Sequence, residues 1–236
     1  MSSVVSSRRE GAVAVITHDD GKANAYSPGV LDQLGDALDA AERDARAVLL
    51  TGRAGVLSAG FDLRTMTAGE DHMRALVAAG ARFLARLFTF PMPVLVASPG
   101  HALAAGALVL LTADLRIGAD VPSARIGLNE VAIGMALPRF GVELARYRMP
   151  PSHFDGVVLG RTWGPADAVA AGFLDRVVPA GDLLEVALAE ATALAELRSG
   201  AVTQTKRTAR GPLVDDILSD LDEDLAKLTA PVDPRR

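Results

Sequence analysis

Two short segments rich in glycine and alanine contain the residue types from which an anion-binding site can be built. They are LSAGFDL at residues 57–63 and SPGHALAAGAL at residues 98–108. Each follows a strand-like stretch, and the second runs into a helix-like one. Turns of this kind leave backbone N–H groups without internal partners, and two converging turns would hold a negatively charged oxygen. Simple close packing of small side chains explains the second segment equally well.

A glutamate among apolar residues is the candidate for proton transfer. Glu130 lies in the stretch IGLNEVAIG at residues 126–134. Apolar surroundings raise the pKa of a carboxyl group because burial disfavours its charged form, and a pKa near neutrality suits a general base. An exposed loop glutamate between buried neighbours is the alternative, and the sequence leaves it open.

The remaining polar candidates are weaker. His101 stands at the start of the second predicted helix, where it would face either a site or solvent. Lys206, Arg207 and Arg210 form a basic cluster that is either a solvated helix face or a phosphate contact. The spacing of His, Asp and Glu predicts no metal site. The glycine patterns of dinucleotide and P-loop sites are absent from the sequence, as is the GxSxG turn of a serine nucleophile.

The composition narrows the class of protein. The 236 residues suffice for one large domain, and with 50% hydrophobic residues the chain can build an ample core. A net charge of −5 argues against a nucleic-acid partner. Because the chain has no cysteine, disulfides and thiol nucleophiles are excluded, and we expect a cytoplasmic protein. No apolar run is long enough for a signal peptide or a membrane span, so neither is expected.

Short strands that alternate with helices predict an α/β domain. Strands are expected at residues 12–17, 47–51, 94–97, 114–119 and 124–126. Helices are expected at residues 30–41, 72–90, 101–112, 152–159, 165–171, 182–197, 201–209 and 213–228. Residues 229–236 are expected to be unstructured. A spiral of strand–helix turns and a doubly wound sheet both satisfy this pattern.

Taken together, the segments resemble the enoyl-CoA hydratase/isomerase (crotonase) family. The matching motifs are KANAYS (22–27), LTG with LSAGFDL (50–63), PMPVLVASPGHALAAGALVLLTADLRIGA (91–119), IGLNE with IG (126–134) and GPADAVAAGFLDRVVPAGDL (164–183). They follow the family's order and spacing over nearly the whole chain. The resemblance implies a spiral core of ββα units at residues 1–185. It also implies a C-terminal helical region at residues 186–236 that caps the core or makes the contacts of a homotrimer or hexamer.

The resemblance also implies a substrate, an acyl-CoA or enoyl-CoA. The backbone N–H groups of Phe61 and Ala105 would form an oxyanion hole around its thioester oxygen. Removal of the proton beside a thioester puts negative charge on that oxygen, and two fixed donors stabilise it. Coenzyme A enters as part of the substrate, so no separate cofactor is expected.

Further positions are implied to contact the coenzyme A part of the substrate. Ala23, Asn24 and Ala25 would belong to the loop that meets the adenine end. Arg64 falls where the family often has a lysine that contacts the nucleotide. Lys206 lies in the helix that in relatives approaches the 3′-phosphate.

The chain departs from the pattern of the family's hydratases at one position. Leu108 stands where a typical hydratase has the first of two glutamates, and the second is present as Glu130. Water addition uses both carboxylates, whereas migration of a double bond needs one base. The sequence GLNE also resembles that of Δ3,Δ2-enoyl-CoA isomerases. We therefore predict an isomerase that uses Glu130. The alternatives are a catalytically weak acyl-CoA-binding member and an atypical enoyl-CoA hydratase.

Overall fold

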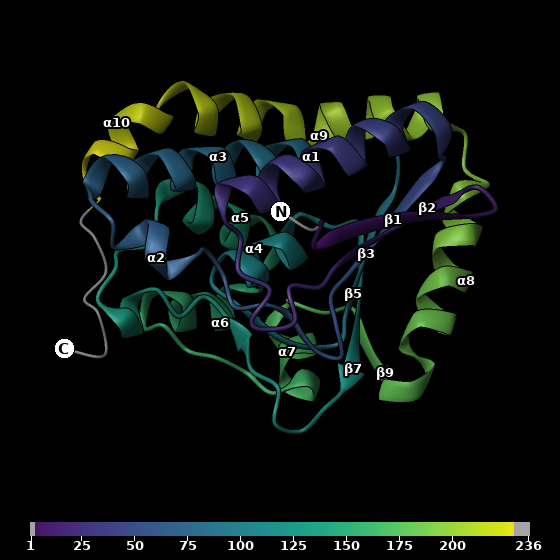
Figure 1. Cartoon of the computed structure of the whole chain (residues 1–236), viewed down its shortest axis with the longest axis horizontal. Coiled ribbons are helices and arrows are strands. Elements are labelled where there is room, and N and C mark those ends of the chain that lie inside the picture. Colours follow the sequence, from purple (N-terminus) through teal and green to yellow (C-terminus); the bar gives the residue numbers. More distant parts are fainter. Residues whose placement is uncertain (1–2, 229–236) are drawn as a thin grey trace.

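The computed structural model describes residues 3–228 and builds two sheets from the same turns of the chain (Figure 1). The six-stranded sheet has the order β1-β2-β3-β5-β7-β9 and the small one the order β4-β6-β8. Only β1 and β2 pair antiparallel. The strands are β1 (Val5–Glu10), β2 (Val13–His18), β3 (Ala47–Thr51), β4 (Gly55–Ser58), β5 (Val94–Ser98), β6 (Gly100–Leu103), β7 (Leu115–Asp120), β8 (Ile126–Gly127) and β9 (Arg176–Pro179).

Three successive turns repeat one pattern: a strand in the large sheet, a strand in the small sheet, and then a helix. The strands β3 and β4 lead to α2 (Leu63–Met66) and α3 (Glu70–Phe88). The next pair, β5 and β6, leads to α4 (Ala105–Thr112). The last pair, β7 and β8, leads through the 3₁₀ turn η1 (Val131–Ile133) to α5 (Arg139–Arg148). This repetition confirms the spiral of ββα units.

The first helix shows how local sequence sets the elements. Ser27 caps α1 (Pro28–Asp44) by accepting a hydrogen bond from the N–H of Val30 at 3.3 Å, and Pro28 occupies the first turn. A proline there loses nothing, because its missing N–H would have had no partner inside the helix. The apolar positions at helical spacing are buried, as predicted.

The predicted helix at residues 101–112 is wrong in its first turn. Residues Gly100–Leu103 form β6, which pairs with β4 and β8, and α4 begins at Ala105. A Cβ on Gly100 would overlap the backbone of Gly55, so the two strands approach through their glycines. Small apolar residues without a clear period gave the sequence no signal for this boundary.

The last third of the described chain is mostly helical. It contains α6 (Pro151–Val158), α7 (Pro165–Ala171), the 3₁₀ turn η2 (Ala180–Asp182), α8 (Leu183–Ala195), α9 (Ser199–Ser219) and α10 (Leu221–Ala226). We expected separate helices at 201–209 and 213–228, but α9 continues through Pro212. The proposed domain boundary after residue 185 falls inside α8 and stays a prediction. Residues 229–236 lie outside the described part.

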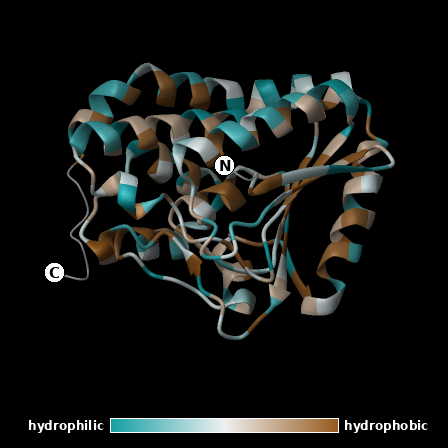
Figure 2. Cartoon of the chain, in the orientation of Figure 1, coloured by the Kyte–Doolittle hydropathy of each residue, from teal (hydrophilic) through white to brown (hydrophobic). Residues whose placement is uncertain are grey.

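Hydrophobic packing covers both faces of the large sheet. Helix α8 lies against its outer face, where Leu49, Leu95 and Ile117 pack on Ala187 and Ala191 (Figure 1). The main core lies between the sheets and helices α1, α3 and α4. Hydrophobic and hydrophilic residues alternate along α9 and α10, as expected for helices with one buried side (Figure 2). Within residues 3–228, no helix is both long and apolar enough to span a membrane.

A buried ion-pair cluster fastens α9 to this core. The carboxylate of Asp114 accepts from Lys206 and Arg210, each at 2.7 Å, and from the backbone N–H of Val94 at 2.8 Å. Lys206 also donates to the carbonyl of Met92, and Arg210 to that of Phe88 at the end of α3. Burial lowers the pKa of Lys206, although the charge of Asp114 opposes that shift. One carboxylate thus holds two buried cations.

We expect Asp114→Asn to lower the free energy of unfolding by about 3–5 kcal/mol, because it leaves two buried cations without their counter-charge. Urea unfolding followed by circular dichroism measures this change. Asp216→Asn is the matched control, since Asp216 pairs with Arg139 at the surface and should change stability by about 1 kcal/mol or less. Equal effects of the two substitutions would show that the buried cluster does not fasten α9.

Candidate active site

The small sheet brings three loops to one edge. Parallel strands end on the same side of a sheet, so the residues that follow β4, β6 and β8 are neighbours. Phe61 comes three residues after β4, Ala105 two after β6, and Glu130 three after β8. The sheet order β4-β6-β8 puts the Ala105 loop between the other two. Two candidate oxyanion donors and the candidate base therefore share one edge.

Short distances join the three loops directly. A Cβ built on Gly60 would stand 2.9 Å from the Cβ of Ala104 and 3.5 Å from the nitrogen of Ala105, so only glycine fits. Gly60 also has a φ of +103°, which glycine adopts without strain. On the other side, the N–H of Ala104 donates to the carbonyl of Gly127 at 3.0 Å. The two Gly/Ala-rich segments therefore converge, with the Glu130 loop beside them.

The N–H of Phe61 takes no part in the backbone hydrogen bonds that its neighbours form. Tyr26 forms a parallel bridge with Phe61: its N–H donates to Gly60 at 2.8 Å, and its carbonyl accepts from Asp62 at 3.0 Å. In such a bridge the central residue's own N–H points to the opposite side. Within residues 3–228, this N–H donates to no backbone or side-chain acceptor.

The N–H of Ala105 lies at the first residue of α4. It too has no acceptor within the described chain, as expected in the first turn of a helix. Ala104 precedes it with φ +49° and ψ −124°, a conformation that favours glycine. Gly106 packs so closely on Ser58 of β4 that a Cβ there would overlap its carbonyl. This backbone presents a free N–H to the space between the loops.

Glu130 is the buried titratable group at this edge. Glu130 is only 3% exposed, and its Oε2 has no hydrogen-bond partner in the described structure. The Oδ1 of the neighbouring Asn129 also lacks a partner there. Burial raises the pKa of Glu130 to about 7, a shift that its own backbone N–H partly opposes. A carboxyl group with a pKa near neutrality can both take up and return a proton.

Leu108 stands one turn into α4 with a fully apolar environment. It is 1% exposed and packs toward α5, with its Cδ2 3.6 Å from where a Cβ on Gly141 would stand. A leucine side chain transfers no proton, which leaves Glu130 as the candidate base at this edge.

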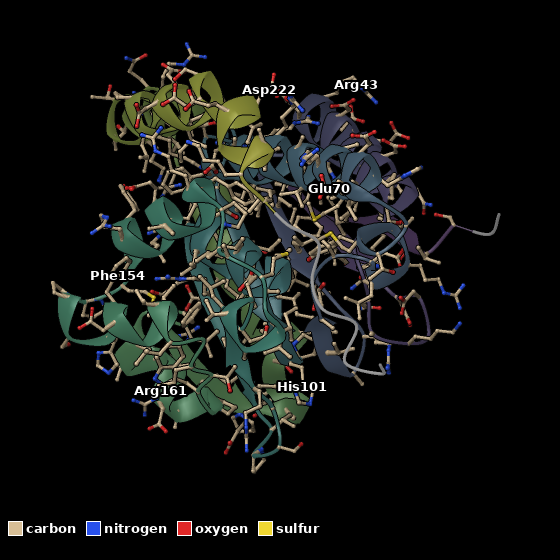
Figure 3. The ribbon with its side chains drawn as sticks, turned by 90° about the vertical axis from the view of Figure 1, so that its left-hand side faces the viewer. Arg43, Glu70, His101, Phe154, Arg161 and Asp222 are labelled. Atoms are coloured by element: carbon tan, nitrogen blue, oxygen red, sulfur yellow. The ribbon has the colours of Figure 1, made fainter. Side chains whose placement is uncertain are left out.

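A groove lies beside the two segments that carry the free N–H groups. It has a volume of about 310 Å³ and is lined by Lys22, Ala23, Arg53, Ala54, Gly55, Val56, Ala59, His101 and Leu103. Ala59 and Leu103 each lie two residues before a candidate oxyanion donor. His101 lies at the opposite end of the molecule from Arg43 and Asp222 of α1 and α10 (Figure 3). Two basic side chains at the groove suit an anionic ligand.

Comparisons with known proteins identify the family of this chain. The family model described as enoyl-CoA hydratase/isomerase matches residues 8–231. The chain belongs to this family. It is 36% identical over 195 residues to a putative enoyl-CoA hydratase of Thermus thermophilus, covering 79% of this chain and 74% of that protein. It is 33% identical over 181 residues to the human mitochondrial enoyl-CoA delta isomerase 1, covering 75% and 60%.

Solved structures of family members share the fold. A family protein from Pseudomonas syringae superposes with a TM-score of 0.93 at 41% identity, covering 96% of this chain and 98% of that one. An enoyl-CoA isomerase from Mycobacterium tuberculosis gives a TM-score of 0.90 at 34% identity, covering 96% and 100%. The crotonase fold expected from the sequence is therefore confirmed.

The residues predicted to contact coenzyme A in this crotonase-family protein lie in different settings. Ala23 is exposed and lines the groove, and Ala25 is half-buried beside it. Asn24 is fully buried and φ is +51° there. Its amide donates to the carbonyls of His18, Val56 and Leu57. The side chain of Asn24 thus holds this loop to β4, and any contact with a ligand would come from its neighbours.

The two predicted cationic contacts are also separated. Arg64 is exposed on α2, free to meet a phosphate from that position. Lys206 is 7% exposed, and its ammonium group is held by Asp114 and the carbonyl of Met92. Within this subunit that pairing leaves the Lys206 ammonium group engaged, because removing it from Asp114 would strand a buried carboxylate. The alternative of a solvated helix face is therefore wrong for Lys206, whereas its contact with the 3′-phosphate stays a prediction.

Several residues of this site were not predicted from the sequence. Lys22 and Arg53 line the groove, and Arg53 donates to the carbonyl of Lys22, which ties the two segments together. Tyr26, whose backbone pairs with Phe61, lies in the motif KANAYS, but no role was predicted for it. The signal for the basic pair was its place in the matched segments: Lys22 is the first residue of KANAYS, and Arg53 directly follows LTG. In residues 3–228, no group of three or more His, Asp and Glu could hold a metal ion.

Replacing the buried carboxyl should change how stability depends on pH. The carboxyl of Glu130 ionises near pH 4.5 when unfolded and near pH 7 when folded, so the wild type loses stability as the pH rises from about 4.5 to about 7 and no further above that. We expect Glu130→Gln to match the wild type near pH 4 and to exceed it by roughly 1–3 kcal/mol at pH 8.5.

Urea unfolding at the two pH values measures this difference. Glu185→Gln on the exposed face of α8 is the matched control and should show no such divergence. A constant difference between Glu130→Gln and the wild type across this range would mean that the Glu130 carboxyl is solvated.

Proposed function

We propose that this protein is an enoyl-CoA isomerase that converts 3-enoyl-CoA into 2-enoyl-CoA. One observation carries the proposal: a single buried carboxyl group with a free oxygen and a pKa of about 7, Glu130, shares a sheet edge with the free N–H groups of Phe61 and Ala105. Leu108, at the place of a hydratase's other glutamate, leaves one base, which is what double-bond migration requires.

The proposed reaction moves one proton by way of one carboxylate. Ionised Glu130 removes a proton from C2 of the 3-enoyl thioester, and the electron pair of that C–H bond moves into the conjugated system. The thioester oxygen becomes negative and accepts hydrogen bonds from Phe61 and Ala105. The protonated Glu130 then returns the proton to C4, so that the double bond lies between C2 and C3. Each such donor is worth about 2.7–4 kcal/mol in the transition state.

The groove beside Ala23 is the proposed site of the coenzyme A part. The basic residues Lys22 and Arg53 in its lining support a contact with the phosphates of the nucleotide, and Ala59 and Leu103 bring the lining within two residues of the two N–H donors. Arg64 is proposed as a further phosphate contact. A homotrimer or a hexamer of two trimers remains the proposed assembly, and a cytoplasmic location the proposed compartment.

The names of the relatives support a reaction on enoyl-CoA, but they do not distinguish hydration from isomerisation. Both the hydratase of Thermus thermophilus and the human isomerase are similar to this chain. The choice of isomerase therefore depends on position 108 and on Glu130.

We expect the wild type to isomerise 3-enoyl-CoA, with kcat/KM rising as the pH increases through about 7, because the base must be ionised. Glu130→Gln should lower kcat by a factor of about 10² to 10⁴. The protein is incubated separately with 3-enoyl-CoA and with 2-enoyl-CoA, and the thioester products are quantified by chromatography.

The control Glu185→Gln should leave the rate unchanged, since that carboxylate is on the exposed surface of α8. Isomerisation that survives Glu130→Gln would contradict the proposal. Hydration of 2-enoyl-CoA faster than isomerisation would make the protein a hydratase despite Leu108. Tight binding of both thioesters without turnover would identify an acyl-CoA-binding protein.

A further inference from the structure

A glycine in the middle of α3 receives the ring of Phe61. Gly80 lies in α3 (Glu70–Phe88) and is buried, and a Cβ built on it would overlap Cζ and Cε1 of Phe61. The ring therefore occupies the space that any other residue at position 80 would fill. Glycine is unfavourable in a helix interior compared with alanine, so helix formation does not account for Gly80.

The ring and the backbone of Phe61 are held from two directions. The bridge to Tyr26 fixes the peptide groups on either side of Phe61. The space left by the missing side chain of Gly80, called here the notch at Gly80, fixes the Phe61 ring. Phe61, Gly80 and Ala105 line one narrow apolar crevice that has no room for a water molecule. With both supports in place, the direction of the Phe61 N–H has little freedom.

We propose that Gly80 is a positioning residue for the oxyanion hole: its missing side chain lets the Phe61 ring dock on α3 and thereby aims the Phe61 N–H at the thioester oxygen. This inference rests on the proposed function for the role of that N–H. A donor must lie 2.7–3.1 Å from the oxygen it stabilises, so a displaced ring that rotates the peptide weakens the contact. A misplacement of about 1 Å can cost a factor of 10² in rate.

A binding experiment tests this role without depending on turnover. Calorimetry compares hexanoyl-CoA with S-hexyl-CoA, a thioether that lacks the carbonyl oxygen. The wild type should bind the thioester more tightly, and Gly80→Ala should reduce that preference about tenfold or abolish it, with the affinity for the thioether unchanged. In the isomerase assay the same variant should lower kcat about 10- to 100-fold and raise KM up to about tenfold, in step with its weaker binding of the thioester.

Two further variants separate positioning from general damage. Phe61→Leu removes the ring and should also weaken the preference, whereas Phe61→Leu with Gly80→Ala should restore part of it, because the smaller side chain leaves room for the methyl group. Gly35→Ala in α1 is the matched control, since nothing lies within 4 Å of a Cβ there. It should leave both ligand affinities unchanged.

The outcomes distinguish this inference from the proposed function. A thioester preference that is retained in both Gly80→Ala and Phe61→Leu overturns the role of Gly80, even if the wild type is an isomerase. A wild type that prefers the thioester but does not isomerise contradicts the proposed function, and the variants still decide the role of Gly80. A wild type without any thioester preference overturns both.

Discussion

The pairing of three short parallel strands is the constraint on which the rest of the site depends. Ser58 of β4 and Ile126 of β8 both pair with Ala102 of β6, so the loops that follow start from one level of the sheet. The strands approach closely because glycines face each other at 55 and 100. Phe61, Ala105 and Glu130 are far apart in sequence, and this register is what makes them neighbours.

The same edge holds polar groups that the fold leaves without partners. Two backbone N–H groups and the Oε2 of Glu130 make no hydrogen bond within residues 3–228. A buried polar group without a partner costs about 1–3 kcal/mol, and the strained backbone at Ala104 adds to that cost. Elsewhere the carboxylate of Asp114 satisfies two cations and a backbone N–H. Buried side-chain nitrogens of His18 and Arg74 also lack partners, but they lie outside this edge. Unpaired donors and an unpaired carboxyl oxygen at one edge are what a site for a polar ligand requires.

How far the sequence predicts the structure depends on whether a local signal decides the outcome. Ser27 and Pro28 defined the start of α1 because capping is local, and the matched motifs predicted the spiral and its convergent loops. The sequence could not show β6, whose partners lie about 25 to 45 residues away, nor the burial of Lys206, which depends on Asp114. Pro212 indicated a break, yet α9 continues because Lys206 and Arg210 before it and Val214 and Ile217 after it are buried against the core. The notch at Gly80 is a contact between distant segments, and no pattern in the sequence indicates it.

The close approach of Gly60 and Ala104 has a consequence for how this chain can change over generations. A side chain added at position 60 meets the methyl group of Ala104, and a larger residue at 104 would meet the loop at 60 in a backbone conformation that already disfavours it. A substitution at either position therefore needs a compensating change at the other. Position 108 is under no such backbone constraint, because its neighbour at Gly141 is approached through side-chain atoms that can repack.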